Sequence, residues 1–348
     1  MRVSFDGGRL NERGVAVALY DYAFHARLQL GVEPVVLHDA SAAVEVDQVA
    51  RFAALFPTHA YRNPEERRAL IEEQRIDVAY ALKTTRPRYP LAPGRRTVVH
   101  EVFRFFDPHG DAYAYISPWL AEAAAAGRYP AVPHIVDPPP PRGNLRAQYG
   151  VPREAVVVGR HGGPDQLNLP YIPQAIEAAL AARSDLWMML LNTARFSHHE
   201  RIVHVPRLPD RGGVADFVAS CDVGLNARLG GEAFGLAIAE FLAQDKPVLV
   251  WEGGRDRHHL ALVDDPQFRF RTREDLVRAL LRFEPRPGAG RWRARVAPFA
   301  PEPVMQTFAR VFLEGPPRAR PRLPLGFRMI ARAKERAQRW RDSHWMTA

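Results

Sequence analysis

The sequence predicts an α/β protein with two doubly wound domains that face each other across a cleft. Short apolar strands alternate with helical stretches through most of the 348 residues, a pattern typical of parallel sheets with helices on both faces. The alternation is interrupted by the proline-rich run 137–142 and then begins again. Because this run fits neither a helix nor a central strand, we expect a stiff linker between two domains.

The first domain is expected to cover residues 1–136. Its apolar runs predict strands at 1–5, 33–37, 77–81, 97–99 and 113–117, and helices at 15–30 and 120–126. The segment 303–348 is expected to pack back onto this domain.

The second domain is expected to cover residues 143–302. The predicted strands are 155–158, 186–191, 201–205, 223–226 and 247–251, and the predicted helices are 172–182, 214–220 and 234–243. Sheets of this kind bind ligands at the carboxyl ends of their strands. Glu232 follows the strand 223–226 and is therefore expected at that edge.

Composition narrows the protein class. No run approaches the roughly 20 apolar residues of a membrane span, and the first residues lack the apolar core of a signal peptide. The single cysteine, Cys221, excludes an intramolecular disulfide. We therefore expect a cytoplasmic protein.

The net charge of +9 is concentrated near the C-terminus, where the segment 317–341 holds eight arginines and Lys334 against one acid, Glu335. Aromatic and basic residues do not interleave as nucleic-acid recognition requires, so we expect no nucleic-acid partner. The segment 323–340 predicts an amphipathic helix with one apolar face, formed by Leu323, Phe327, Ile330, Ala337 and Trp340. This face could pack on the first domain, which we favour, or the helix could rest peripherally on an anionic membrane.

Glu232 and Glu240 are the most informative pair in the chain. A helix that begins at about Phe234 would direct the free N–H groups of its first turn at an anion, most naturally a phosphate. Glu232 would lie in the loop before this helix, and Glu240 would lie about two turns along it. A phosphate with a carboxylate on either side, each able to bind hydroxyl groups, is typical of a nucleotide-sugar site.

Arg160 lies in a glycine-containing turn, 159–163, directly after the first strand of the second domain. Its planar guanidinium suits a phosphate, although glycine turns after strands are common and a plain turn is an equal alternative. Gly14, before the first long helix, would let a ligand approach that helix from the other domain; a plain turn is again the alternative.

His100 ends a predicted strand of the first domain, where an α/β site gathers its groups. The alternative for a lone histidine is a buried structural role, which is the commoner case. The pairs at 198–199 and 258–259 lack the spacing of a helical metal site. We expect no metal and no cofactor.

Together these segments resemble the group 1 glycosyltransferases, retaining enzymes of the GT-B fold with an E-x7-E motif. The resemblance covers most of the chain and is strongest over 156–163 and 220–250. The glutamate pair is framed as in that family by Cys221-Asp222, Phe234-Gly235 and Lys246-Pro247-Val248, and the first domain contributes Val99-His100 and Ser117-Pro118-Trp119-Leu120.

The resemblance implies a role for each matching residue. Glu232 would approach the hydroxyls of the donor sugar, beside the backbone of Ala233, Phe234 and Gly235. Glu240 would accept hydrogen bonds from the ribose.

For the remaining groups, the resemblance implies that Arg160 neutralises the diphosphate, which Gly14 admits from the first domain. His100 would lie near the reacting sugar carbon, with its backbone or its ring in contact with the donor. Sugar choice would depend on side chains around Asn226, Arg228 and Glu232.

One position departs from the family pattern. A lysine directed at the diphosphate is usual about five residues after the arginine, but Asp165 occupies this position. We expect Arg195, after the next strand, to supply the missing charge.

The sequence thus favours a metal-independent, retaining glycosyltransferase that moves a hexose-type sugar from a nucleotide-diphosphate sugar to a glycan, glycolipid or protein acceptor. Two alternatives remain open: a binding protein that kept the fold without turnover, and a GT-B nucleotide-sugar epimerase.

Overall fold

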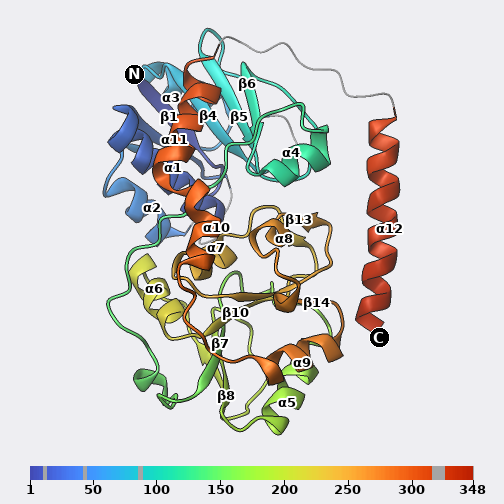
Figure 1. The fold of residues 1–348 in the computed structure, drawn as a ribbon. Helices are drawn as coiled ribbons and strands as arrows, with labels where there is room; N and C mark the ends of the chain where they lie inside the picture. The colour runs from blue at the N-terminus through green and yellow to red at the C-terminus, as the bar shows by residue number, and fades with distance from the viewer. Residues whose placement is uncertain (11–13, 42–44, 85–88, 316–325, 348) are drawn as a thin grey trace. The chain divides into compact units, whose positions relative to one another are not determined.

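The computed structural model describes residues 1–10, 14–41, 45–84, 89–315 and 326–347. The chain divides into two compact units: unit 1 contains Met1–Ile135 and Phe299–Phe327, and unit 2 contains Val136–Pro298 and Arg328–Ala348. Each unit is built on a parallel sheet (Figure 1). The predicted α/β class with two doubly wound units is therefore confirmed.

The described residues of unit 1 form a six-stranded sheet in the order β3-β2-β1-β4-β5-β6. The strands are β1 (Arg2–Asp6), β2 (Glu33–Asp39), β3 (Thr58–Tyr61), β4 (Val78–Lys83), β5 (Arg96–Glu101) and β6 (Ala112–Tyr115). The helices are α1 (Gly14–Leu30), α2 (Val46–Ala53), α3 (Pro64–Glu73), α4 (Pro118–Ala125), α11 (Pro301–Phe308) and the π-helix η4 (Ala309–Leu313).

The elements α2, β3 and α3 were not predicted. Charged residues dominate α3, so its apolar periodicity gives little signal. Local chemistry defines α3 instead: Pro64 opens the helix, and the Asn63 side chain accepts a hydrogen bond from the Glu66 N–H at 2.8 Å. An N-cap followed by proline is a recognisable start signal.

The return segment of unit 1 is held by aromatic packing. Phe308 and Phe312 are fully buried, and their ring centroids lie 5.1 and 5.5 Å from that of Tyr80. The Arg96 side chain also donates to the Phe312 carbonyl at 2.8 Å. Unit 1 ends at Phe327, and Arg328–Ala348 belongs to unit 2. The expectation that the whole of 303–348 packs on the first domain is therefore wrong for Arg328–Ala348.

The described residues of unit 2 form a second six-stranded parallel sheet, in the order β14-β12-β10-β7-β8-β9. Its strands are β7 (Val156–Arg160), β8 (Leu186–Leu191), β9 (Ile202–Val205), β10 (Val223–Asn226), β12 (Val248–Trp251) and β14 (Arg269–Phe270), and a separate pair is formed by β11 (Gly231–Glu232) and β13 (Asp256–Arg257). The helices are α5 (Ile172–Ala182), α6 (Arg211–Ala219), α7 (Leu236–Ala243), α8 (His259–Leu262), α9 (Arg273–Arg282), α10 (Arg291–Val296) and α12 (Phe327–Thr347), with 3-10 turns η1 (Ala147–Tyr149), η2 (Pro266–Phe268) and η3 (Ala297–Phe299).

Two strand glycines set the position of α7 against the sheet. A Cβ on Gly159 would lie 2.2 Å from Cys221 Sγ and 3.1 Å from the Phe241 ring, and a Cβ on Gly224 would lie 3.0 Å from that same ring. Phe241 therefore packs directly over the backbone of β7 and β10. This close packing brings the start of α7 to the carboxyl ends of both strands.

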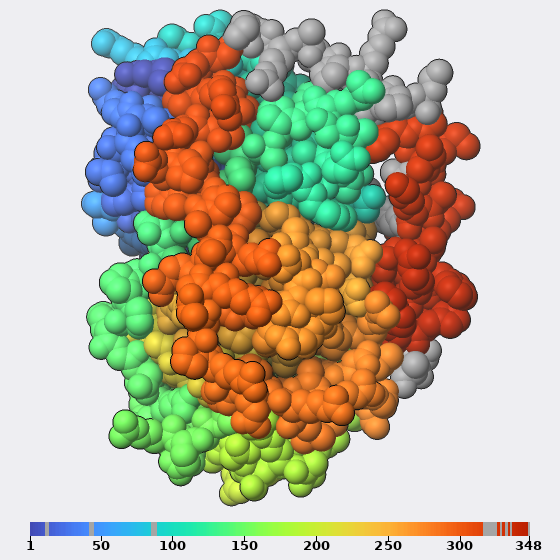
Figure 2. All heavy atoms as spheres, in the orientation of Figure 1, coloured from blue at the N-terminus to red at the C-terminus, as the bar shows by residue number. Residues whose placement is uncertain are grey.

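The last helix, α12, packs within unit 2 through a face that the sequence did not predict. Gln338 and Asp342 are buried, whereas Ile330 and Trp340 of the expected apolar face are 57% and 64% exposed; Leu323 lies outside the described residues. Figure 2 shows the C-terminal half of the helix, in red, against the orange residues of this unit. The expected packing on the first domain is therefore wrong, because polar contacts rather than the apolar face fix this helix.

Candidate functional site

Arg160 occupies the carboxyl end of β7 and is only 4% exposed. Within the described part of the chain, its guanidinium donates only to uncharged oxygens: the Thr193 hydroxyl at 2.7 Å and the carbonyls of Gly163 and Asn192 at 2.6 and 3.3 Å. Burial lowers the pKa of Arg160 to about 10, an effect that Glu232 and Asp165 partly offset. The group is thus still charged at neutral pH, held in place by dipoles and well suited to an anion.

Glu232 lies close to this cation and has two partners of its own. Asn226, the last residue of β10, donates to its carboxylate at 3.1 Å, and Arg228 forms an ion pair with it at 2.9 Å. The positive charge of Arg228 also acts on Arg160. One carboxylate and two guanidiniums therefore gather at the carboxyl ends of β7 and β10.

The backbone of Glu232 is fixed by β11 rather than by a loop, which corrects the expectation for this residue. Its N–H donates to the His259 ring at 3.3 Å, and its carbonyl accepts from the His258 N–H at 3.0 Å. Gly231 has a φ of 67°, and a Cβ there would lie 1.9 Å from the Asp256 carbonyl oxygen. Only glycine allows β11 and β13 to approach this closely.

The start of α7 adds a second feature that favours anions. The helix begins at Leu236, two residues later than predicted, after Gly235 in the left-handed region at a φ of 98°. Among the residues that the structure describes, no side chain caps this end. The first-turn N–H groups and the positive end of the helix dipole thus lie next to Glu232, whose Cβ would be 3.5 Å from a Cβ on Gly235.

Glu240 lies on α7 as predicted, and its contact with His161 was not anticipated. The two atoms His161 Nε2 and Glu240 Oε2 lie 3.3 Å apart. Burial, together with the charge of Arg160, lowers the pKa of His161 to about 4, so the ring is neutral at pH 7. In the sequence, the only indication that His161 belongs to the site is that it directly follows Arg160.

The predicted residues therefore divide into two groups. Arg160, Asn226, Glu232 and Glu240 come together in unit 2, with Ala233, Phe234 and Gly235 leading from Glu232 into α7. Gly14 begins α1 in unit 1, and Arg195 is exposed in the loop after β8.

His100 is a core residue of unit 1. Its side chain is fully buried within β5, its Nδ1 lies 2.9 Å from the Tyr80 hydroxyl, and its ring packs 5.2 Å from that of Phe312. Burial lowers its pKa to about 3. A ring enclosed in this way does not reach a ligand, so contact of the His100 ring with the donor is not supported, and a structural role for the ring fits this geometry.

Asp165, at the position of the usual lysine, is exposed and acts electrostatically on Arg160. Arg228 acts electrostatically on Arg160, whereas Arg195, which we expected to supply the missing charge, is exposed. Among the described residues, no cluster of histidine, cysteine or acidic side chains could hold a metal ion. None of the described helices combines the length and hydrophobicity needed to cross a bilayer.

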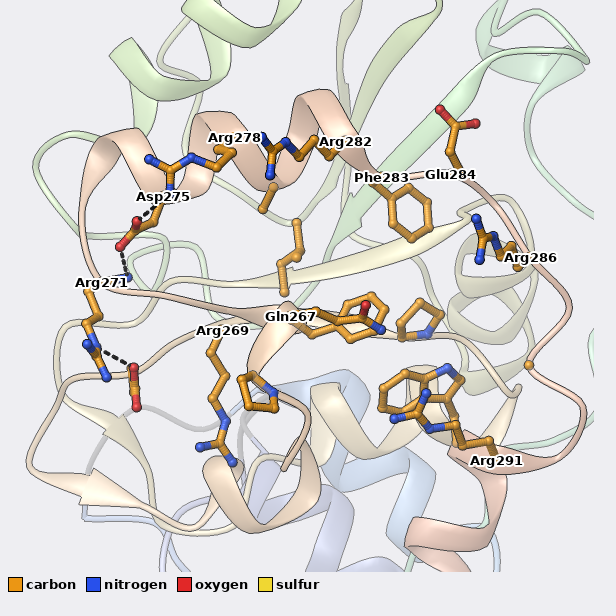
Figure 3. Close-up of a pocket in the computed structure, with 18 of the residues that line it drawn as sticks. Gln267, Arg269, Arg271, Asp275, Arg278, Arg282, Phe283, Glu284, Arg286 and Arg291 are labelled. Carbon is orange, nitrogen blue, oxygen red and sulfur yellow. Dashed lines mark hydrogen bonds and ion pairs between the residues drawn. The ribbon is translucent and has the colours of Figure 1, made fainter.

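A groove of about 880 Å³ elsewhere in unit 2 is distinct from these residues (Figure 3). Arginines on and around α9 line it, namely Arg269, Arg271, Arg278, Arg282, Arg286 and Arg291. Three are paired with carboxylates, at 2.6 Å (Arg271–Glu252), 3.2 Å (Arg278–Asp275) and 2.6 Å (Arg291–Asp265). Its described lining contains none of the residues predicted for the donor site.

The fold, with two parallel six-stranded sheets, matches that of solved glycosyltransferase structures. Among solved structures, the chain is similar to HepE from Anabaena in complex with UDP-glucose, with a TM-score of 0.67 and 16% identity over 89% of this chain and 98% of that chain. It is also similar to WaaG, a glycosyltransferase involved in lipopolysaccharide biosynthesis, with a TM-score of 0.59 and 12% identity over 90% of this chain and 100% of that one.

A further match is a candidate UDP-N-acetylglucosamine 2-epimerase from Listeria monocytogenes, with a TM-score of 0.56 and 12% identity over 91% of this chain and 98% of that one. No protein-family model and no curated protein matches the sequence. At these identities the similarity establishes the fold, and the chemistry has to be argued from the residues.

Proposed function

We propose that this protein is a retaining glycosyltransferase that takes a hexose-type sugar from a nucleotide-diphosphate sugar without a divalent metal. The observation that carries the proposal is the buried Arg160, whose hydrogen-bond partners among the described residues are all uncharged. Glu232 acts on it electrostatically, and Glu232 leads into the start of α7, where no described side chain forms a cap. A diphosphate would complete this arrangement, since it supplies the anion that the guanidinium and helix N–H groups lack.

The roles follow from position. Arg160, with Arg228 beside it, stabilises the negative charge that develops on the leaving diphosphate, which is the main contribution to rate in such a site. Glu232, held by Asn226 and Arg228, binds the sugar hydroxyls. Glu240 binds the ribose, and the neutral His161 ring lies beside its carboxylate.

The transfer exchanges one bond for another on the same face of the sugar. The bond between the anomeric carbon and the diphosphate oxygen breaks, and a bond to the acceptor hydroxyl forms. The hydroxyl proton leaves with the diphosphate. The complex of HepE with UDP-glucose makes UDP-glucose the first donor to test here.

Donor turnover tests the proposal. The protein is incubated with a panel of nucleotide sugars in EDTA, and free nucleoside diphosphate is measured. We expect slow release by donor hydrolysis, abolished by Glu232→Gln and unchanged by Glu154→Gln, an exposed glutamate of the same unit. NMR of the first-formed sugar anomer should show retention.

The same assay separates the alternatives. The appearance of an epimerised nucleotide sugar would favour the hypothesis that the protein is an epimerase, an alternative suggested by the similar structure from Listeria. Donor binding without any turnover would favour a non-catalytic binding protein.

We also propose that α12 contacts an anionic membrane surface. Met329 and Trp340 are 76% and 64% exposed, and their separation of eleven residues places them on one face of the helix. Lys334 and Arg336 are exposed nearby. Apolar side chains among basic ones suit the interface of an anionic bilayer.

Vesicle cosedimentation checks this contact. The protein should sediment with vesicles that contain phosphatidylglycerol and much less with phosphatidylcholine alone. The double variant Met329→Ser/Trp340→Ser should lose binding with unchanged thermal stability, because both side chains are exposed. Equal sedimentation of the variant and the wild-type protein would contradict the proposal.

A further inference from the structure

We infer that the C-terminal half of α12 positions Glu232, with Asp342 and Gln338 as the positioning residues. The inference rests on the proposed function only in treating Glu232 as a donor-site residue. The contacts that support it lie within unit 2.

The first contact joins α12 to the glycine-containing loop before β13. Asp342 is 7% exposed, and its Oδ2 accepts the Gly254 N–H at 3.0 Å. A Cβ on the neighbouring Gly253 would lie 2.7 Å from Asp342 Oδ1. Carboxylate and loop are therefore in direct contact, and glycine is needed for their close approach.

The second contact joins α12 to β13 itself. Gln338 is 6% exposed; its Oε1 accepts from Arg257 at 3.1 Å, and its Nε2 donates to Asp342 at 2.5 Å. The charge of Asp342 also acts on Arg257, whose pKa burial lowers. One amide thus links the carboxylate of the helix to the guanidinium of the strand.

From this loop and β13 the connection to Glu232 is short. β13 pairs with β11 in the register Gly231↔Asp256 and Glu232↔Arg257, and the Asp256 N–H donates to the Gly230 carbonyl at 3.0 Å. A Cβ on Gly254 would lie 2.5 Å from the Gly231 nitrogen. The residue that Asp342 holds therefore packs directly against the residue before Glu232.

The apolar contribution of α12 to this interface is modest. Trp345 lies under the Arg271 guanidinium at 5.4 Å, and Met346 packs on the core of unit 2. Gln338 and Asp342, rather than buried apolar area, therefore determine the position of the helix. A shift of the helix would break their hydrogen bonds and leave buried polar groups without partners.

Hydrogen exchange of the ligand-free full-length protein tests the inference independently of donor chemistry. In Asp342→Ala, amides in 228–235 and 252–260 should exchange at least about tenfold faster, while those of β8 stay unchanged. Asp342→Asn should largely restore protection, because its amide oxygen can accept the Gly254 N–H. Lys334→Ala, on the exposed side of α12, should behave as wild type.

Binding gives the functional consequence. In Asp342→Ala, affinity for UDP-glucose should fall about tenfold relative to affinity for UDP, because Glu232 faces the sugar. Faster amide exchange of Asp342→Ala that is confined to 252–260 would overturn the inference. Faster exchange throughout the protein, together with a lower melting temperature, would also overturn it. If the wild-type protein binds no nucleotide, the proposed function fails, while the exchange result still decides the inference.

Discussion

Arg160 shows how a single buried charge can indicate the ligand of a site. A guanidinium in the interior is usually compensated by a carboxylate, yet the described partners of Arg160 are a hydroxyl and two carbonyls. The pKa of about 10 reflects this incomplete compensation of the buried charge. A bound diphosphate would supply the missing negative charge.

Replacing Arg160 should therefore weaken binding of nucleoside diphosphates. A charge-assisted hydrogen bond contributes about 1.5–3 kcal/mol, so we expect Arg160→Ala to bind UDP about 10- to 100-fold more weakly by calorimetry. Arg153→Ala, an exposed arginine of the same unit, serves as the control. Equal affinities for the two variants would exclude Arg160 from the site.

Acid sensitivity follows from the buried histidines. The pKa of His161 in the folded protein is about 4, below that of an unfolded histidine at about 6.5. As the pH falls from 7 to 5, the unfolded state binds protons that the folded state does not, so stability is lost. We expect this loss to be smaller in His161→Gln by about 1–2 kcal/mol, measured by urea unfolding at each pH. An identical pH dependence would contradict the assignment.

The residues of the site were only partly predictable from the sequence. Position at strand ends was enough to bring Arg160 and Glu232 together, because parallel strands end at one edge of a sheet. The proximity of Arg228 to Arg160, and of His161 to Glu240, depends on side-chain directions that spacing does not define. His100 was also predicted at the end of a strand, but it lies within β5 and its ring packs in an aromatic core.

At the scale of elements, β11 and β13 determine how Glu232 is held. They are two-residue strands without an apolar pattern, so the sequence gives no strand signal for them. Their close approach depends instead on glycines with positive φ, Gly231 and Gly254. The buried face of α12 was also predicted wrongly. Its buried residues, Gln338 and Asp342, are polar, so an apolar pattern does not indicate them.

A pair of glycine substitutions tests this element. Gly231→Ala should destabilise the protein by about 1–3 kcal/mol, because it adds strain in the left-handed region and a clash with the Asp256 carbonyl. Gly230→Ala is the matched control, with nothing within 4 Å of its new Cβ, and should stay within about 0.5 kcal/mol. Similar unfolding midpoints in urea would show that β11 and β13 do not require this contact.

At the scale of the whole molecule, the alternation of strands and helices and the proline-rich run predicted the α/β class and two sheets. The path of the chain after residue 298 was harder to predict. Phe299–Phe327 belongs to unit 1 and Arg328–Ala348 to unit 2, and the sequence pattern does not indicate which unit each segment joins.

Truncations reveal this division. Ending the chain at residue 298 removes Phe308 and Phe312 from the core of unit 1, and losing large buried aromatics costs several kcal/mol, about 3–5 for each. We expect this fragment to be insoluble or to melt far below wild type by calorimetry. A chain that ends at residue 326 should keep unit 1 intact; equal melting of the two fragments would refute the assignment.

The central claim is that unit 2 binds a nucleotide sugar between Arg160, Glu232 and Glu240. Calorimetric titration of UDP-glucose in EDTA tests it most directly, with wild type, Glu240→Ala and the exposed control Glu154→Ala. We predict binding by wild type and the control, and about 10- to 100-fold weaker binding by Glu240→Ala, since its carboxylate bonds to ribose are lost. The same affinity in all three proteins would contradict the account.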